Sequence, residues 1–354
     1  MNPLAVFLAL ACGQEQASGP TGWTSEVVLE VPSRLSGCAV GELLPEHAGN
    51  EIAAVGADGA VYVAWREGGE WKSEKVYQAP GEAVQCVIGD ADPRYPGNEI
   101  VCVGMAEGEE NYQLPGAAYV VWRADGAWHG EEILRTEFLL HAVAVGDGGV
   151  YASGFTEKLH WMEVAEDGWR TEAVARFRKM APKSLQHVMA AGKSMVVVGP
   201  QRVAICTTNG GVYVASKGPK GWVTVVIDDR PAGRARLAYD GKRYLTADED
   251  GKLTLINHNF RSNVTLHTES KKLRGAVLAD LDPAAPGLEA ATAGYSGNVT
   301  VVREMEDGWV PEIVFTDTDK LHHLVSGDLD GRPGEELVTC GYSGKLVVIR
   351  RAAE

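Results

Sequence analysis

The sequence LHHLVSGDLDGRPGEELVTCGYSGKLVVIR, residues 321–350, decides the fold. It predicts three short strands, at 321–327, 336–340 and 345–349, separated by the turn-rich segments DLDGRPGE and YSG. Alternating apolar residues bounded by Gly, Pro and Asp are typical of short antiparallel strands. We therefore expect an antiparallel sheet at the end of the chain.

The same pattern recurs earlier in the chain. VLADLDPAAPGLEAATAGYSGNVTVV begins at Val277, VIGDADPRYPGNEIVCVG at Val87 and VGELLPEHAGNEIAAVGADGAVYVAW at Val40. Recurrence at such intervals indicates an architecture assembled from one repeated supersecondary unit. A β-sandwich also has many short strands, but it does not explain the repeat.

A second recurring phrase marks another strand of each unit, and it usually has a tryptophan as its second residue. It reads GWTSEVVLE from Gly22, EWKSEKVY from Glu70, AWHGEEIL from Ala127, GWRTEAVA from Gly168, GWVTVVID from Gly221, GWVPEIVF from Gly308 and, in degenerate form, RSNVTLHT from Arg261. Seven such outer strands accompany seven inner segments, which begin near Gly37, Gln85, His141, His187, Ala235, Gly275 and His323.

The two ends of the chain complete one another. The chain opens with an outer strand that has no inner strands before it, and it closes with three inner strands that have no outer strand after them. A β-propeller closes its ring in this way, so that no sheet edge is left open between the ends. The sequence therefore predicts an all-β, seven-bladed β-propeller over residues 22–354, with four-stranded blades and the N-terminal strand joining the last blade.

The N-terminus, MNPLAVFLALACGQEQASGP, has an apolar run at 4–11 that ends in small residues and Cys12. Residues 1–12 resemble a bacterial lipoprotein signal, which implies export, lipidation of Cys12 and attachment to the cell envelope. A plain secretory signal or an ordinary apolar tail is the alternative. Residues 13–21 are interpreted as a flexible tether. No apolar run reaches about 18 residues, so we expect membrane attachment only through the lipid.

Composition and motifs exclude several function classes. The chain has 354 residues, 45% of them hydrophobic, and a formal net charge of −15, which argues against a nucleic-acid partner. The glycines lie in turn-like segments and form neither a P-loop nor a dinucleotide fingerprint, so no nucleotide cofactor is expected. The five cysteines after Cys12 lie in apolar strands and are interpreted as small buried side chains. We expect a monomer.

Acidic loops follow the inner segments of three repeats. Their acids are Asp90, Asp92, Glu99, Asp280, Asp282, Glu289, Asp328, Asp330 and Glu336. These loops resemble those of the FG-GAP or VCBS family of propeller blades, which implies calcium bound by carboxylates in a structural role. The alternative is a turn in which each carboxylate accepts hydrogen bonds from neighbouring backbone N–H groups.

Alignment of the inner segments places Gln85, His141, His187 and His323 in one ring around the central channel. Converging imidazoles can bind a transition metal or transfer protons, or they can hydrogen-bond across a wet channel. The GYSG turns on the same face add Tyr295 and Tyr342 as candidates for proton transfer.

Basic residues gather just before the inner segments, among them Arg34, Arg234, Arg274 and Lys320. We expect them to form a positive mouth on the face where the inner strands begin, which we call the top face. A mouth of one charge sign concentrates ligands of the other, so an anionic sugar, carboxylate or phosphate is the expected guest.

Two functions remain open from the sequence. The first is an envelope-anchored binding propeller that holds an anionic ligand, such as a carbohydrate, or a protein partner at the top face. The second is a metal-assisted lyase or dehydratase. The chain resembles oligogalacturonate lyases and aldos-2-ulose dehydratases in architecture and residue type, which implies a metal held by the ring and a His or Tyr as base. Transition-metal content distinguishes the two.

Overall fold

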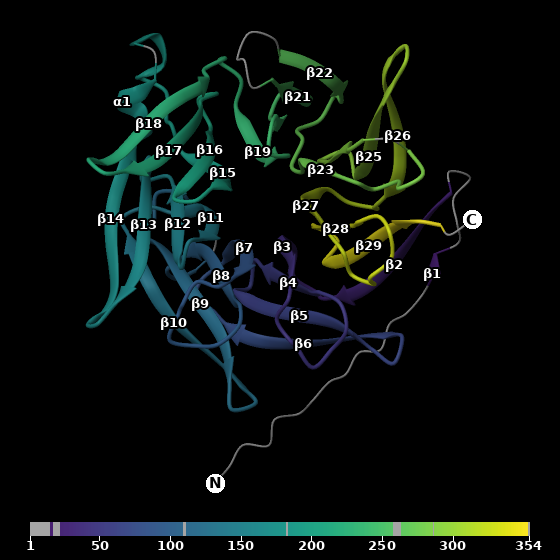
Figure 1. Ribbon diagram of the computed structural model, residues 1–354, viewed down its shortest axis with the longest axis horizontal. Helices are drawn as coiled ribbons and strands as arrows, with labels where there is room; N and C mark the ends of the chain where they lie inside the picture. The colour runs from purple at the N-terminus through teal and green to yellow at the C-terminus, as the bar shows by residue number, and fades with distance from the viewer. Residues whose placement is uncertain are drawn as a thin grey trace.

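The computed structural model describes residues 15–16, 22–108, 111–181, 183–257, 263–285 and 287–352. Within them the strands form seven antiparallel sheets, six of four strands and one of five. The sheets are arranged in a ring, with one edge strand of each sheet nearest the centre (Figure 1). The chain is a seven-bladed β-propeller, which confirms the prediction from the repeat. Cys12 and most of the expected tether lie outside the described residues.

The first three blades follow one another along the chain. Named from the centre outward, blade 1 contains β3 (Leu35–Gly41), β4 (Glu51–Gly56), β5 (Ala60–Glu67) and β6 (Glu70–Gln78). Blade 2 contains β7 (Ala83–Gly89), β8 (Glu99–Met105), β9 (Gly116–Ala124) and β10 (Ala127–Thr136). Blade 3 contains β11 (Leu140–Gly146), β12 (Gly149–Gly154), β13 (Lys158–Ala165) and β14 (Gly168–Arg176).

The remaining blades continue the ring. Blade 4 contains β15 (Gly192–Gly199), β16 (Arg202–Thr207), β17 (Val212–Gly218) and β18 (Gly221–Asp228). Blade 5 contains β19 (Arg234–Tyr239), β20 (Tyr244–Asp248), β21 (Lys252–Ile256) and β22 (Asn263–Thr268). Blade 6 contains β23 (Val277–Ala279), β24 (Glu289–Ala293), β25 (Asn298–Met305) and β26 (Gly308–Thr316).

Blade 7 is built from both ends of the chain. It contains β27 (Leu321–Gly327), β28 (Glu336–Gly341), β29 (Lys345–Arg351) and β2 (Trp23–Glu30), and β1 (Glu15–Gln16) pairs with the outer side of β2. Strand β2 pairs antiparallel with β29, from Trp23 opposite Arg351 to Glu30 opposite Lys345. Trp23 is only 2% exposed and packs among apolar residues of blades 6 and 7. The expected closure of the ring by the N-terminal strand is confirmed.

The outer strands are joined by a repeated hydrogen bond between blades. In five blades the tryptophan of the outer-strand phrase donates its indole N–H to the glutamate of the W-x-x-E phrase in the preceding blade. The bonds are Trp23 to Glu312 at 3.4 Å, Trp71 to Glu26 at 3.0 Å, Trp128 to Glu74 at 2.7 Å, Trp169 to Glu131 at 2.9 Å and Trp222 to Glu172 at 3.3 Å. Blade 5 has neither residue of the phrase, so the series is interrupted on both sides of it. The recurring tryptophan therefore links blades as well as marking a strand.

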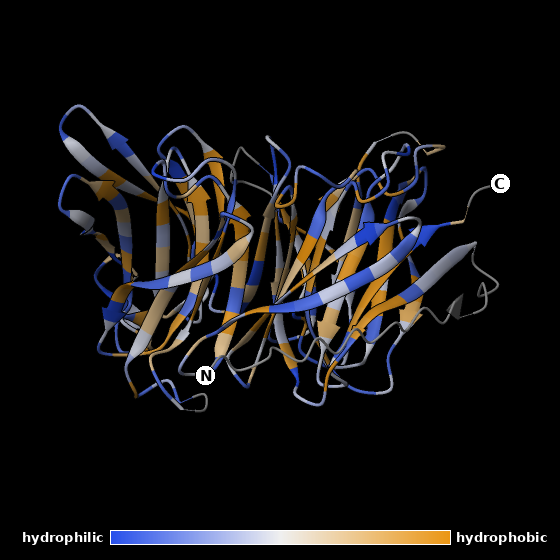
Figure 2. Ribbon diagram, turned by 90° about the horizontal axis from the view of Figure 1, so that it is seen from below, coloured by the Kyte–Doolittle hydropathy of each residue, from blue (hydrophilic) through white to orange (hydrophobic). Residues whose placement is uncertain are grey.

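The inner strands approach closely because glycines end several of them. A Cβ on Gly327 would lie 2.5 Å from a Val40 methyl group, closer than atoms can pack. Gly41 meets Ile88, Gly89 meets Val145 and Gly146 meets Val197 in the same way. Apolar residues run along the strands between blades, and polar residues concentrate toward the loops and outer strands (Figure 2).

Two short helical turns, α1 (Phe177–Met180) and the 3-10 turn at Lys183–Leu185, lie between blades 3 and 4. In the described part of the chain, no helix has the length and apolar character needed to cross a bilayer.

Candidate ligand site in the central channel

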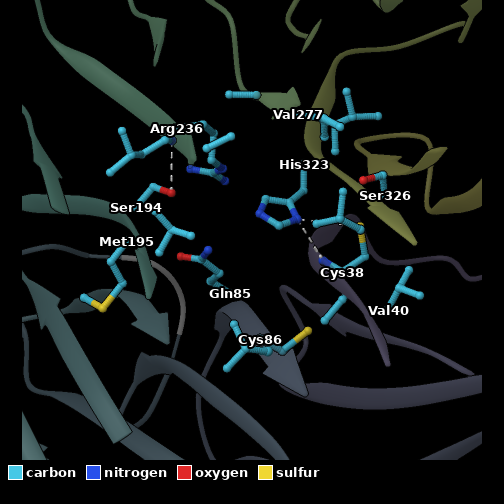
Figure 3. Close-up of a pocket in the computed structure, with 18 of the residues that line it drawn as sticks. Cys38, Val40, Gln85, Cys86, Ser194, Met195, Arg236, Val277, His323 and Ser326 are labelled. Carbon is cyan, nitrogen blue, oxygen red and sulfur yellow. Dashed lines mark hydrogen bonds between the residues drawn. The ribbon is translucent and has the colours of Figure 1, made fainter. Parts of the chain in front are cut away.

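The inner strands enclose a cavity of about 330 Å³ at the centre of the ring. Residues from six of the blades line it, and its polar lining includes Gln85, Ser194, Arg236 and His323. Figure 3 shows the side chains of Gln85, Arg236 and His323 directed into the same space. Polar groups from four blades that are distant in the sequence therefore lie together around this cavity.

A β-bulge near the start of the inner strands explains why these residues converge. Pairing with the second strand skips one residue, for example between Ala83 and Gln85 and between Leu321 and His323. A bulge leaves one extra residue unpaired and changes the direction of the strand. The residues after the bulge form a set that we call the channel ring: Gly37, Gln85, Ala142, Ser194, Arg236 and His323. In blade 6, Gly275 holds this place through its hydrogen bond to Ala293.

The bulged residues themselves form a second set, one residue nearer the top face, which we call the entry ring. It consists of Ser36, Val84, His141, Lys193, Ala235, Arg274 and His322.

The ring of Gln85, His141, His187 and His323 expected from the sequence is not assembled. Gln85 and His323 lie in the channel ring, whereas His141 lies in the entry ring with His322. His187 is exposed and lies between the 3-10 turn and β15, outside the channel. Gln85, Ala142 and His323 each follow the same bulge and lie four residues before the glycine that ends the strand, so the alignment is one residue early at His141. The insertion before blade 4, which contains His187, mimics the spacing of an inner strand.

Arg236 is the channel residue that the alignment missed, because it placed Ala235 in the ring. The Arg236 side chain is nearly fully buried and donates to two backbone carbonyls, Ala235 O at 2.9 Å and His322 O at 3.1 Å. Among the described residues no carboxylate forms an ion pair with it, and its Nε–H has no hydrogen-bond acceptor. Burial and then the charge of Arg274 lower the pKa of Arg236 to about 10. The guanidinium therefore stays protonated at neutral pH.

His323 is neutral and presents its second ring nitrogen as a donor. Its Nδ1 accepts the backbone N–H of Cys38 at 3.2 Å, so the ring proton must lie on Nε2. Burial and then the charge of Arg236 lower the pKa of His323 well below its usual value. A neutral imidazole beside Arg236 avoids a second buried positive charge.

Gln85 and Ser194 complete the polar lining. Gln85 is 5% exposed, and its Oε1 has no hydrogen-bond partner within the described residues. The Ser194 hydroxyl accepts the backbone N–H of Leu237 at 3.3 Å, which leaves its proton available for donation. The cavity is therefore lined mainly by donors, with Gln85 Oε1 as an acceptor.

The two entry-ring histidines have the opposite tautomer from His323. His322 Nδ1 donates to Ser36 O at 2.7 Å and His141 Nδ1 donates to Lys193 O at 3.1 Å. Burial lowers the pKa of both imidazoles, with Lys193 as the next cause for His141 and Arg236 for His322. Among the described residues, no three His, Cys, Asp or Glu of the channel bring ligand atoms within 4.8 Å of one another.

The expected positive mouth is assembled around two tyrosines. Lys320 Nζ lies over the rings of Tyr342, at 5.1 Å, and Tyr295, at 5.6 Å. Arg34 lies over Tyr342 at 5.3 Å and Arg274 over Tyr295 at 4.8 Å. The two hydroxyls are 3.4 Å apart. Arg34 also pairs with Glu82 and Arg274 with Glu249, whereas Lys320 forms no ion pair with any of the described residues. We call Arg34, Arg274, Lys320, Tyr295 and Tyr342 the mouth cluster.

Arg234 does not belong to the mouth cluster, although the sequence suggested that it would bind ligand. It is fully buried and pairs with Asp228 and with Asp248, the latter at 3.0 Å. Its Nε also donates to Gly210 O at 3.2 Å. With these partners it is a structural residue of blade 5 rather than a ligand-binding one.

The acidic loops lie at the opposite ends of the inner strands, where the final glutamate of each loop holds the backbone. Glu99 Oε2 accepts from Ala91 N at 2.8 Å and from Asp92 N at 3.1 Å. Glu289 and Glu336 accept from their loops in the same way. Glu51 makes these bonds in blade 1, where the sequence showed no motif. The hydrogen-bonded turn therefore accounts for the glutamates of all four loops.

The aspartates of these loops differ in their partners. Asp92 pairs with Arg94 at 2.6 Å and Asp282 with Arg303 at 3.2 Å, whereas the arginines nearest Asp330 lie farther away, Arg332 at 3.6 Å and Arg350 at 3.8 Å. In blade 7, Asp328, Asp330 and Glu336 bring carboxylate oxygens within 4.8 Å of one another, and in the described part of the chain no other group of three possible ligands does so.

The cysteines of the described residues are all unpaired and buried, as expected. Burial raises the pKa of Cys102 and of Cys206 to about 12, so these thiols are not nucleophiles at neutral pH.

Comparison with known proteins supports the fold alone. The chain is similar to the WD40 β-propeller domain of Doa1, with a TM-score of 0.65 and 9% sequence identity over 97% of this chain and 98% of that one. No protein-family model matches the sequence. No curated protein matches it either. The resemblance to FG-GAP or VCBS repeats thus stays a prediction. Propellers commonly bind ligands or partner proteins, but the fold does not determine which.

Proposed function

We propose that this chain is a binding propeller of the cell envelope, attached through a lipid on Cys12, that holds an anionic ligand at its top face. An acidic carbohydrate is the ligand class that we favour. The observation that carries the proposal is the mouth cluster, which places Arg34, Arg274 and Lys320 against two tyrosine rings at the entrance to the channel.

The charge of the mouth cluster opposes that of the whole molecule. The formal net charge is −15, and Glu82 and Glu249 pair with two of the three cations of the cluster, Arg34 and Arg274. Lys320 adds a positive charge that forms no ion pair with the described residues, so the entrance is a local departure from an acidic surface. Such a departure raises the local concentration of anions and speeds their association. The tyrosine rings hold the cations in place at the entrance, and their hydroxyl groups are polar groups that suit the oxygens of a sugar.

The binding test uses the full chain and isothermal titration calorimetry. An oligogalacturonate is titrated beside its fully methyl-esterified form, which has the same length but no charge. We expect the acidic form to bind more weakly as salt is raised, and the neutral form not to bind. Lys320→Ala should weaken binding, whereas Lys75→Ala, on the outer strand of blade 1, should not.

Equal binding of the two forms, or binding of neither, would contradict the proposed ligand class. If neither form binds, the chain is used to capture proteins from the envelope fraction. A protein that wild type retains and Lys320→Ala does not would mean that the top face binds a protein instead. The binding function also predicts that the oligogalacturonate is recovered uncleaved; unsaturated products would favour the lyase. The anchor is tested by fractionation, where Cys12→Ser should release the protein from the membrane fraction.

A further inference from the structure

We propose that a carboxylate group of the ligand enters the central channel and binds Arg236, with Gln85, Ser194 and His323 as further partners. This inference deepens the proposed function and depends on it, because it assigns the chemical group that the channel recognises. The mouth cluster then contacts the rest of the ligand.

The charge of Arg236 is the first reason. A buried guanidinium without a carboxylate is costly, because the cation loses its hydration and gains no opposite charge. Two backbone carbonyls accept from Arg236, but neither carries a full charge, and the Nε–H has no acceptor among the described residues. Arg234, two residues earlier on the same strand, differs from Arg236 because two aspartates balance the charge of its guanidinium. The channel thus has an unbalanced positive charge that a monoanion would neutralise.

The arrangement of donors is the second reason. His323 presents Nε2–H, because its Nδ1 is occupied by Cys38 N. The Ser194 proton is available, because its oxygen already accepts from Leu237 N. The Gln85 amide supplies both a donor and, at Oε1, an acceptor without a partner. The oxygens of a ligand carboxylate would accept hydrogen bonds from these donors. A hydroxyl beside that carboxylate would donate to Gln85 Oε1.

The size and charge of the site limit the ligand further. The cavity of about 330 Å³ lies at the lower end of the usual range for small-molecule pockets, which suits one sugar-acid unit or another small hydroxy acid. Arg236 is the only channel-ring residue with a positive charge, since the pKa of His323 is lowered. One cation fits a carboxylate better than a phosphate dianion, and the planar guanidinium also matches a carboxylate in shape.

The test measures binding of D-glucuronate to the full chain by calorimetry, with D-glucose as the uncharged match and inorganic phosphate as competitor. We expect D-glucuronate to bind, D-glucose not to bind, and phosphate not to displace the sugar acid. Arg236→Met should weaken D-glucuronate at least about tenfold, since it removes hydrogen bonds to a charged group. Gln85→Met should weaken it by a smaller factor, and Lys75→Ala should leave it unchanged.

The outcomes separate this inference from the proposed function. If acidic oligosaccharides bind wild type and Arg236→Met alike, the ligand stays at the mouth and the channel site is wrong. If no acidic ligand binds wild type, both proposals fail. Displacement by phosphate would overturn the assignment of a carboxylate. Should Arg236→Met fail to fold, Gln85→Met decides, because the side chain of Gln85 makes no hydrogen bond with the described residues that the change would break; unchanged affinity in that variant would overturn the inference.

Discussion

His322 and His323 are consecutive residues, yet their Nδ1 atoms have opposite hydrogen-bond roles. Nδ1 of His322 donates to Ser36 O at 2.7 Å, whereas Nδ1 of His323 accepts from Cys38 N at 3.2 Å. The free nitrogen of His322 is consequently an acceptor, and that of His323 a donor. The β-bulge at the start of β27 places His322 in the entry ring and His323 in the channel ring. Each imidazole therefore has its own hydrogen-bond partners.

Stability should fall as pH falls below about 6.5, because three imidazoles are buried in neutral form. Burial lowers the folded-state pKa of His141, His322 and His323, so below about 6.5 the unfolded chain binds more protons than the folded one. Their contribution is complete above that pH and is lost as pH falls toward the folded pKa. Urea unfolding between pH 7.5 and pH 5 measures the change.

The control for this titration is His323→Gln, which keeps an acceptor for Cys38 N. The control is needed because carboxylates with a raised pKa change the stability in the opposite direction as pH falls. Burial raises the pKa of Glu99 to about 7, for example. The difference in unfolding free energy between wild type and His323→Gln should shift by up to about 1.4 kcal/mol per pH unit below 6.5. A difference that is constant with pH would contradict a neutral His323.

Removal of residues 22–31 should strongly destabilise the ring, because it deletes β2 and exposes the edge of β29. The smaller change Trp23→Ala should cost about 3–5 kcal/mol, since it empties a buried site between blades 6 and 7. Val223→Ala, on the exposed surface of β18, is the control and should have little effect. Equal unfolding free energies for Trp23→Ala and wild type would show that closure by β2 does not hold the ring.

The indole–carboxylate bonds between outer strands should contribute measurably to stability. Trp128→Phe removes the donor to Glu74 and should cost about 0.5–1.5 kcal/mol beyond the packing change. Trp309→Phe is the matched control, because Trp309 makes no hydrogen bond through its indole among the described residues. Equal losses for the two variants in denaturant unfolding would mean that the bonds contribute nothing. Amide exchange should also be fastest in blade 5, where the series is interrupted.

A calcium response, which the acidic loops lead us to expect, should come from blade 7. Its three carboxylates lie within 4.8 Å of one another, whereas Asp92 in blade 2 is held by Arg94. Calcium should therefore raise the melting temperature of wild type and of Asp90→Asn, and it should not raise that of Asp328→Asn. Chelator should reverse the rise. A wild-type melting temperature that does not respond to calcium would contradict calcium binding by the acidic loops.

Much of the fold could be predicted from the sequence, because turn residues and alternating apolar residues are local signals. The strand expected at 321–327 is β27, and the strand lacking a tryptophan after Arg261 is β22. The closing strand followed from chain order alone. The indole–carboxylate series was visible as W-x-x-E, but the sequence could not show that each bond joins neighbouring blades.

The channel was predicted only in part, because an error of one residue in the alignment exchanges a residue of the channel ring for one of the entry ring. Gln85 and His323 were placed correctly, and Arg34, Arg274 and Lys320 do meet at the mouth. The alignment was one residue early in blade 5 and put Ala235 where Arg236 lies. It also put His141 in the wrong ring. Arg234 and Arg236 look equivalent in sequence, and only the fold shows that Arg234 has carboxylate partners and that Arg236 has none within the described part of the chain.

The central claim, that Arg236 carries an unbalanced charge in the channel, is tested most directly by the unfolding free energy of Gln85→Glu in two backgrounds. Beside Arg236 the new carboxylate gains an ion pair, so Gln85→Glu should be no less stable than wild type. In the Arg236→Met background the same carboxylate is buried without a partner and should destabilise the protein. We expect a coupling free energy of about 0.5–3 kcal/mol between the two changes. The same loss of stability in both backgrounds would contradict the account, because it would mean that the charge of Arg236 is already neutralised or does not reach the channel.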